Sequence, residues 1–197
     1  MALKAIFFDM DGVLVLSEPL HCRAWVELLH MQNIEYPDFF RQEEYVGVSD
    51  NAIASEFAKK LELNELPEIL LEKKQQFFLN MIRSVKLEAP IGRNQFLEKS
   101  RSKYLIAVVS SSSKMEVEAI LNKEELNGLF DFIITGDDVI NHKPLPDAYL
   151  LALEKAGVTP DEAIAIEDSR SGIVAAKKAG IEVINFDGNF ESAFTFF

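Results

Sequence analysis

The sequence predicts an α/β fold: a doubly wound parallel sheet, with a helical segment inserted after the first strand. Three observations predict it. Short, unbroken apolar runs alternate with helical stretches, as in an open parallel sheet whose strands are buried on both faces. Several of these runs end in polar residues, and such sheets bind ligands at the carboxyl ends of their strands. A long stretch after the first run contains only helical patterns.

Apolar runs define the expected strands, at residues 5–8, 105–109, 132–134, 163–166 and 183–184. Polar residues follow three of them directly: Asp9, Ser110 and the pair Glu167 and Asp168. Because the carboxyl ends of parallel strands meet at one edge of a sheet, we expect these side chains to lie close together.

Helices are expected between the later strands, at about 114–122, 147–156 and 169–179. Asp147, preceded by a proline, and Ser169 are typical helix starts, and Gly157 and Gly180 are typical helix ends. These helices would connect the strands and cover the sheet.

The stretch after the first strand is expected to hold helices at about 18–31, 50–61 and 66–83. The last of these carries an apolar face made of Phe77, Phe78, Met81 and Ile82. We therefore expect residues 1–16 and 89–197 to form a catalytic core, and residues 17–88 to form a separate helical domain. The crossings would lie near 15–17 and 88–92. The apolar tail at 191–197 is expected to be a short edge segment or the end of the sheet.

Composition limits the partners. The formal net charge is −12 and the pI about 4.7, so the surface repels nucleic acid and anionic lipid. The single cysteine, Cys22, excludes an internal disulfide and fits a reducing compartment. No apolar run reaches the roughly 18 residues of a membrane span, and the first is too short for a signal peptide. We expect a soluble, cytoplasmic monomer.

The segment Asp9-Met10-Asp11-Gly12 directly follows the first strand. Two carboxylates at this spacing can hold a hard cation such as Mg²⁺, which prefers oxygen ligands. An Asp can also attack phosphorus and form an aspartyl-phosphate. The alternative is an ordinary turn in which an Asp caps a helix.

Taken singly, each of the other polar motifs also has a purely structural interpretation. Paired acids such as Glu167 and Asp168 are costly at a buried strand end unless a cation or donors satisfy them, but Asp168 or Ser169 could merely cap a helix. Ser110 opens a run of four serines that could be a polar loop. Lys143, before Pro144, could place an ammonium near a phosphate or lie on the surface.

Taken together and in this order, the four motifs resemble the haloacid dehalogenase superfamily. They are Asp9-Met10-Asp11-Gly12-Val13, Ser110, Lys143-Pro144-Leu145-Pro146-Asp147 and Glu167-Asp168-Ser169. The helical insert resembles the small α-helical cap of that superfamily. The segment from Ser17 to Trp25 is similar to the β-phosphoglucomutase-like branch, which includes many sugar-phosphate phosphatases.

The resemblance implies a role for each motif. Asp9 would be the nucleophile and a Mg²⁺ ligand. Asp11 would be the general acid and base, and its backbone carbonyl would bind the metal. Ser110 and Lys143 would hold the transferring phosphoryl oxygens. Glu167 and Asp168 would complete the metal site.

The cap shows departures from the mutase pattern. In the mutase an Arg that grips a second phosphate follows Gly-Val-Ser, whereas Asp50 follows Gly47-Val48-Ser49 here. Lys73 or Lys74 could supply the missing cation, but both are interpreted as solvated helix residues.

Two histidines complete the set of candidate residues. His142, next to Lys143, is interpreted as a loop residue. His21 matches a hinge residue of this branch and could support the site.

Four classes of function remain open. A Mg²⁺-dependent phosphatase acting on small phosphorylated metabolites, sugar phosphates first among them, explains all the motifs. A β-phosphoglucomutase-type phosphomutase is the alternative, and Asp50 speaks against it. A haloalkanoate dehalogenase would leave Asp11, Glu167 and Asp168 unexplained. A non-enzymatic binding protein on this fold should have lost Asp9 or Asp11.

Overall fold

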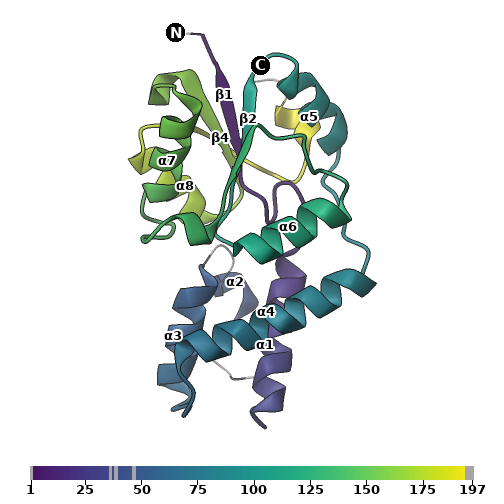
Figure 1. Cartoon of the computed structure of the whole chain (residues 1–197), viewed down its shortest axis with the longest axis vertical. Coiled ribbons are helices and arrows are strands. Elements are labelled where there is room, and N and C mark those ends of the chain that lie inside the picture. The colour runs from purple at the N-terminus through teal and green to yellow at the C-terminus, as the bar shows by residue number, and fades with distance from the viewer. Residues whose placement is uncertain (1, 36, 38–39, 46–47, 194–197) are drawn as a thin grey trace.

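The computed structural model describes residues 2–35, 37, 40–45 and 48–193. Figure 1 shows two parts, a sheet flanked by helices and a group of helices beyond one end of that sheet. The chain enters the second part after its first strand and then returns to complete the sheet.

Within the described residues, five strands form one parallel sheet in the order β3-β2-β1-β4-β5. They are β1 (Ala5–Phe8), β2 (Leu105–Val109), β3 (Phe132–Ile134), β4 (Ala163–Glu167) and β5 (Glu182–Asn185). The apolar runs therefore predicted every strand of this sheet. The central strand is β1, which lies between β2 and β4, so the residue that follows it stands at the middle of the ligand-binding edge.

The sheet is covered on both faces because alternate residues of a strand point in opposite directions. From β1, Ile6 and Phe8 enter one core, and Ala5 and Phe7 enter the other. Helices α5 (Arg93–Arg101) and α6 (Lys114–Lys123) cover the first face, and α7 (Asp147–Ala156) and α8 (Arg170–Lys178) cover the second (Figure 1). The doubly wound architecture is as expected.

The inserted helices are α1 (Glu18–Met31), α2 (Gln42–Tyr45), α3 (Asp50–Lys60) and α4 (Pro67–Ser84). They have a core of their own, with Trp25, Leu28, Phe57 and Leu70 among its buried residues. The short α2 was not expected from the sequence. The predicted apolar face of α4 is confirmed: Phe78 and Ile82 are buried, and Phe77 and Met81 pack beside them.

The two crossings between the parts lie against each other. The backbone N–H of Leu16 donates a 2.9 Å hydrogen bond to the carbonyl of Glu88. A second contact between the parts is made where α4 lies against α6. The inserted helices are thus joined to the core at a paired crossing and also pack against core helix α6.

The described end of the chain is not an edge segment; among the described residues no strand follows β5, which agrees with the other expectation, that the sheet ends there. Residues Phe190–Ala193 form a short helix, α9, because Phe190 is buried between Phe96 and Phe186, with ring centroids 4.8 and 4.5 Å away. The rest of the predicted tail, 194–197, lies outside the described residues. Among the helices that the structure describes, none is both long and apolar enough to cross a membrane.

Candidate active site

The first site loop follows β1 and depends on a glycine. Gly12 has φ +83°, a conformation that side chains with a Cβ disfavour. A Cβ on Gly12 would lie 1.9 Å from Oδ2 of Asp168. The glycine therefore allows the loop after β1 to approach the loop after β4.

Lys143 lies at the centre of the site and is buried. Its Nζ donates to Oδ1 of Asp9 at 2.9 Å, to Oε1 of Glu167 at 2.6 Å and to the carbonyl of Val109 at 2.9 Å. Burial alone would lower the pKa of Lys143, but the carboxylates of Asp9 and Glu167 outweigh it and raise the pKa above its usual value. The ammonium therefore stays charged beside Asp9.

Glu167 is held from several sides. Tyr149 on α7 donates its hydroxyl to Oε1 at 2.5 Å, and the hydroxyl of Ser169 lies 3.4 Å from Oε2. A Cβ on Gly172 would lie 2.0 Å from Oε2, so α8 also packs directly on this carboxylate. Ser169 caps α8 by accepting from the N–H of Gly172 at 3.1 Å, which confirms the helix-cap interpretation for Ser169 and leaves Asp168 facing the site.

The site contains an acidic cluster whose negative charge is only partly compensated. It consists of Asp9, Glu167 and Asp168. One oxygen from each lies within 4.8 Å of the others. Burial and the neighbouring Glu167 raise the pKa of Asp9 well above its usual value and that of Asp168 to about 6. The Oδ1 atom of Asp168 is buried without a hydrogen-bond partner among the described residues. A hard divalent cation would satisfy that oxygen and reduce the repulsion, so these residues fit Mg²⁺.

Unlike the acidic cluster, the side chain of Asp11 has hydrogen-bond partners for both of its oxygens. Its Oδ1 accepts from the hydroxyl of Ser17 and lies 3.1 Å from Nε2 of His21, and its Oδ2 accepts from the hydroxyl of Ser112 at 2.9 Å. Burial would raise the pKa of Asp11, but His21 and the hydrogen bonds from these three neighbours lower it below the usual range. Asp11 is therefore held as an ionised carboxylate, and the expected support from His21 is present.

Besides Ser110, two further serines of the run lie at the site. Ser110 is buried, and its Oγ accepts from the N–H of Ser112 at 3.0 Å. Ser111 and Ser112 line the cleft between core and insert, together with Asp9, Asp11 and Lys143. The structure thus places Ser110 at the strand end and its two successors on the wall of the cleft.

The insert supplies the opposite wall of that cleft. Glu18, His21, Trp25 and Asp50 all line it. Asp50 is oriented by Trp25, whose indole N–H donates to Oδ1 at 2.9 Å. The space open to water in this cleft is about 50 Å³, room for a few water molecules.

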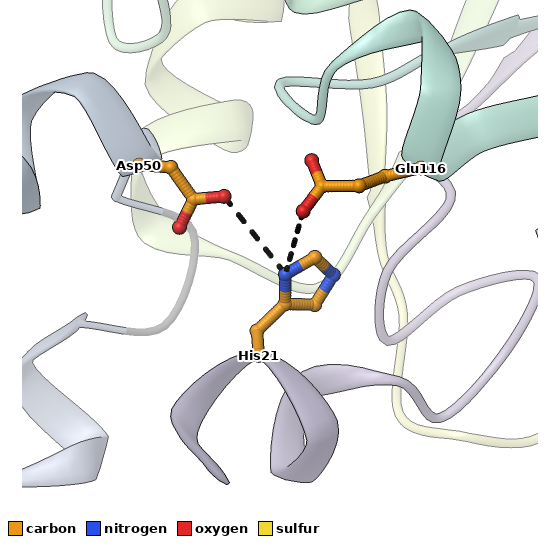
Figure 2. A group of neighbouring side chains, drawn as sticks. All are labelled: His21, Asp50 and Glu116. Atoms are coloured by element: carbon orange, nitrogen blue, oxygen red, sulfur yellow. Dashed lines mark ion pairs between the residues drawn. The ribbon is translucent and has the colours of Figure 1, made fainter. Parts of the chain in front are cut away.

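A second polar cluster joins the insert to the core, and we call it the seam cluster: His21, Asp50, Lys74 and Glu116. Figure 2 shows carboxylate oxygens of Asp50 and Glu116 converging on Nδ1 of His21, each at 4.0 Å. The ammonium of Lys74 contacts all three partners: it donates to Asp50, to Oε1 of Glu116 at 2.8 Å and to Nδ1 of His21 at 2.7 Å.

The expectation that Lys74 is a solvated helix residue is wrong. Its side chain is 0% exposed, and Asp50 and Glu116 raise its pKa against the effect of burial. Lys73 is 41% exposed and paired with Glu65, as a surface residue would be. Because an ammonium only donates, Nδ1 of His21 accepts here and Nε2 carries the hydrogen that faces Asp11. A metal ion is not needed at this cluster, since Lys74 already provides its cation.

Two further residues complete the comparison with the sequence. His142 lies on a loop, as expected, and its Nε2 is 3.3 Å from the side-chain amide of Asn51 on α3. Gly47, in the segment compared with the mutase, lies outside the described residues.

Sequence reasoning missed several residues around the site: Ser17, Ser112, Tyr149 and Glu116. Ser17 and Ser112 lay in segments that the sequence had singled out, but their contacts with Asp11 could not be read from it. Glu116 had a local signal, because Ser113 and Glu116 have the spacing of a capping box. That signal marks a helix start and does not reveal the contact with Lys74.

Comparison with known proteins shows the family of the chain. Residues 6–186 match a family model described as haloacid dehalogenase-like hydrolase. A phosphorylated carbohydrates phosphatase of Thermotoga maritima is 33% identical over 187 residues, covering 92% of this chain and 84% of that protein.

Solved structures resemble the chain over nearly its whole length. The β-phosphoglucomutase of Clostridium difficile has a TM-score of 0.82 at 26% identity, covering 98% of this chain and 87% of that one. A variant of CbbY from Rhodobacter sphaeroides in complex with xylulose-1,5-bisphosphate has a TM-score of 0.78 at 28% identity, covering 96% and 89%.

Proposed function

The chain belongs to the haloacid dehalogenase-like hydrolase family, and from this premise we propose that it hydrolyses small phosphorylated metabolites, sugar phosphates first among them. The reaction would pass through an aspartyl-phosphate on Asp9. The phosphorylated carbohydrates phosphatase of Thermotoga maritima supports this substrate class by similarity.

The observation that carries the proposal is the environment of Asp9. It stands at the end of the central strand, 2.9 Å from the ammonium of Lys143, within an acidic cluster that fits Mg²⁺. Phosphoryl transfer requires an in-line nucleophile and compensation of the negative charge spread over the phosphoryl oxygens. Asp9 would supply the first, and Lys143 would supply part of the second.

The first chemical step would break the bond between phosphorus and the ester oxygen. A carboxylate oxygen of Asp9 forms a bond to phosphorus as that bond breaks, and the leaving oxygen takes a proton from Asp11. In the second step water attacks the phosphorus of the aspartyl-phosphate, Asp11 takes a proton from the water, and Asp9 is released. The ionised Asp11 of this structure is the form that the second step needs. For the first step Asp11 would have to carry a proton, which it gives to the leaving oxygen and regains from the attacking water.

Mg²⁺ would be held by Asp9, Asp168 and the backbone carbonyl of Asp11. When bound, it would neutralise charge on the phosphoryl oxygens. Glu167 lies within reach, but its Oε1 already accepts from Lys143 and Tyr149. We assign to Glu167 mainly the task of holding Lys143. Ser110 and its neighbours Ser111 and Ser112 would bound the phosphoryl site on the β2 side.

The inserted helices would act as a moving cap. We propose 17–88 as its extent, with hinges near 15–17 and 88–92. The space open to water in the cleft is about 50 Å³, so a sugar phosphate would enter more readily if the cap moved away, and closure would exclude bulk water during the reaction.

A phosphomutase is the second candidate, and similarity to the Clostridium difficile β-phosphoglucomutase favours it. Such an enzyme must retain a bisphosphate intermediate. Asp50 lines the cleft on the cap side, and an unpaired unit charge at about 5 Å and an effective dielectric near 20 would repel a phosphate charge by about 3 kcal/mol. Pairing with Lys74 reduces that repulsion, but the described residues of the cap wall present no lysine or arginine to the cleft, so hydrolysis is favoured over isomerisation.

The test is a phosphate-release screen over phosphorylated metabolites with and without Mg²⁺. We expect Mg²⁺-dependent release from sugar monophosphates and little isomerisation of β-glucose 1-phosphate, even with a bisphosphate primer. Isomerisation faster than release would assign the chain to the mutases. No phosphate release from any substrate would refute the proposal.

A further inference from the structure

Glu116 is a buried carboxylate that the reaction does not use. It lies in the first turn of core helix α6, and its side chain is 0% exposed. From there it reaches across the boundary between the core and the cap to Lys74 on α4 (Figure 2 shows its position beside His21 and Asp50).

Donors from both parts of the molecule surround this carboxylate. Its Oε2 accepts from the N–H of Ser113 at 3.1 Å and from the hydroxyl of Ser113 at 2.7 Å, and its Oε1 accepts from Nζ of Lys74 at 2.8 Å. A backbone N–H at a helix start, a hydroxyl and an ammonium form the kind of donor set that binds phosphate and carboxylate ligands.

We propose that Glu116 takes, as part of the chain, the place of a substrate's second anionic group. Its charge joins Lys74 to the core when the cap is closed, so closure needs no second anion from the ligand. The enzyme then accepts monophosphates and disfavours bisphosphates. This inference rests on the proposed phosphatase function and deepens it by naming the substrate class and the residue that selects it.

The charges around the cleft agree with this role. Among the described residues that line the cleft, Lys143 is the only lysine or arginine, and Asp9 and Glu167 already engage it. The cap wall presents the acids Glu18 and Asp50. Lys74 is buried behind that wall and is shared by Asp50 and Glu116. A second phosphate would have to displace Glu116 to obtain a cation.

Helix capping alone does not explain the charge of Glu116. A capping box works with Glu or Gln at this position, because it needs only an acceptor for the N–H of the first residue. The second oxygen of Glu116 crosses to Lys74, and its charge, together with that of Asp50, balances that buried ammonium. The substitution Glu116→Gln therefore keeps the cap of α6 and removes the charge.

The experiment compares Glu116→Gln with Glu118→Gln on the same helix. Glu118 is 58% exposed, so its variant makes the same change in net charge away from the cluster. We measure kcat/KM for a hexose monophosphate and for the matching hexose bisphosphate. We expect the bisphosphate-to-monophosphate ratio to rise at least about tenfold in Glu116→Gln and less than about twofold in Glu118→Gln. Equal ratios in the two variants would overturn the proposal.

A third variant tests whether Lys74 is the cation that becomes available. In Lys74→Met/Glu116→Gln both charges are absent, so the gain toward the bisphosphate should disappear. A gain that persists without Lys74 would contradict the assigned contact.

A binding measurement separates this inference from the proposed function. In an Asp9→Asn background, the rise in Tm with each ligand reports binding without turnover. The otherwise unchanged chain should be stabilised at least as much by the monophosphate as by the bisphosphate, and Glu116→Gln should reverse that order. Stronger stabilisation by the bisphosphate while Glu116 is present would overturn the inference, even if phosphatase activity is found or the Gln variant cannot be purified.

Discussion

Two buried polar clusters of the described chain consist of similar residues. They differ in the direction in which the pKa values of their acids are shifted and in whether every carboxylate has a hydrogen-bond partner. Around Asp9, three carboxylates share one ammonium, two of them have raised pKa values, and an oxygen of Asp168 has no partner. In the seam cluster, the pKa of Asp50 is lowered because Lys74 outweighs burial, and both acids are hydrogen-bonded.

The difference shows how to separate a ligand site from a structural contact when both are buried and charged. Buried charge is tolerated when its partners are within the chain, and excess charge indicates a partner from outside. By this criterion the cluster around Asp9 fits a cation from outside, whereas both acids of the seam cluster already contact a cation of the chain, Lys74. Four substitutions test that comparison, from the largest expected effect to the smallest.

Asp9→Asn should abolish phosphate release, because an amide is a poor nucleophile and a poor Mg²⁺ ligand. Loss of a covalent step costs several kcal/mol of barrier, and each ~1.4 kcal/mol is tenfold in rate. Phosphate release by a contaminant-free preparation is the measurement. Activity above about 10% would remove Asp9 from the mechanism.

Asp11→Asn should slow turnover about 10²–10⁴-fold, since it removes proton transfer but keeps the backbone carbonyl at residue 11. Asp11 connects the two clusters through His21. Isothermal titration with Mg²⁺ should give an affinity close to that of the unchanged chain. A loss of affinity as large as that of Asp168→Ala would refute the division of roles.

Lys74→Met should lower the free energy of unfolding by about 3–5 kcal/mol, because Asp50 and Glu116 would be left as buried acids without their cation. Lys73→Met is the matched control. It removes a neighbouring, exposed ammonium and should cost at most about 1 kcal/mol. Urea unfolding of both variants gives the comparison, and equal losses would show that the seam cluster is not balanced by Lys74.

Asp168→Asn should raise the free energy of unfolding of the metal-free chain at pH 7.5 by about 1–3 kcal/mol, opposite in sign to the effect of Lys74→Met. The folded-state pKa of Asp168 is about 6, above its usual 3.8, so ionisation costs the folded state. That cost is present above pH 6 and vanishes as the pH falls toward 4. The gain should therefore shrink in acid.

Added Mg²⁺ should raise the Tm of the unchanged chain and not that of Asp168→Asn. The variant Asp161→Asn, at an exposed position, controls for the lost charge. Mg²⁺ should stabilise Asp161→Asn as much as the unchanged chain, because the acidic cluster is intact in that variant. A metal-free gain in stability of Asp161→Asn equal to that of Asp168→Asn would show that net charge, and not the acidic cluster, is responsible.

The sequence predicted the strands well because their signal is local. Each apolar run had to be buried on both faces, so composition alone marked it. Helix α5 was missed because Phe96 and Leu97 are its only buried apolar residues, too few for a recognisable period. The strand order was beyond reach, since it depends on contacts between runs far apart in the chain.

The site shows the same limit at the level of side chains. The motifs brought Asp9, Lys143, Glu167 and Asp168 to one place, as the strand ends require. Lys74 was misjudged because helical periodicity places a lysine beside polar neighbours without showing what covers it. Its partners come from positions 24, 42 and 53 residues away along the chain.

The hydrogen bond between Leu16 and Glu88 bears on how the inserted segment can be exchanged in evolution. The cap leaves and rejoins the core at adjacent points, so a segment of almost any length can be exchanged there with little change in the entropy of closing the loop. The core retains all five strands and the acids around Asp9 whichever segment is carried. Exchange of the inserted segment at this one junction can thus change the substrate preference while the five strands and the catalytic residues of the core stay the same.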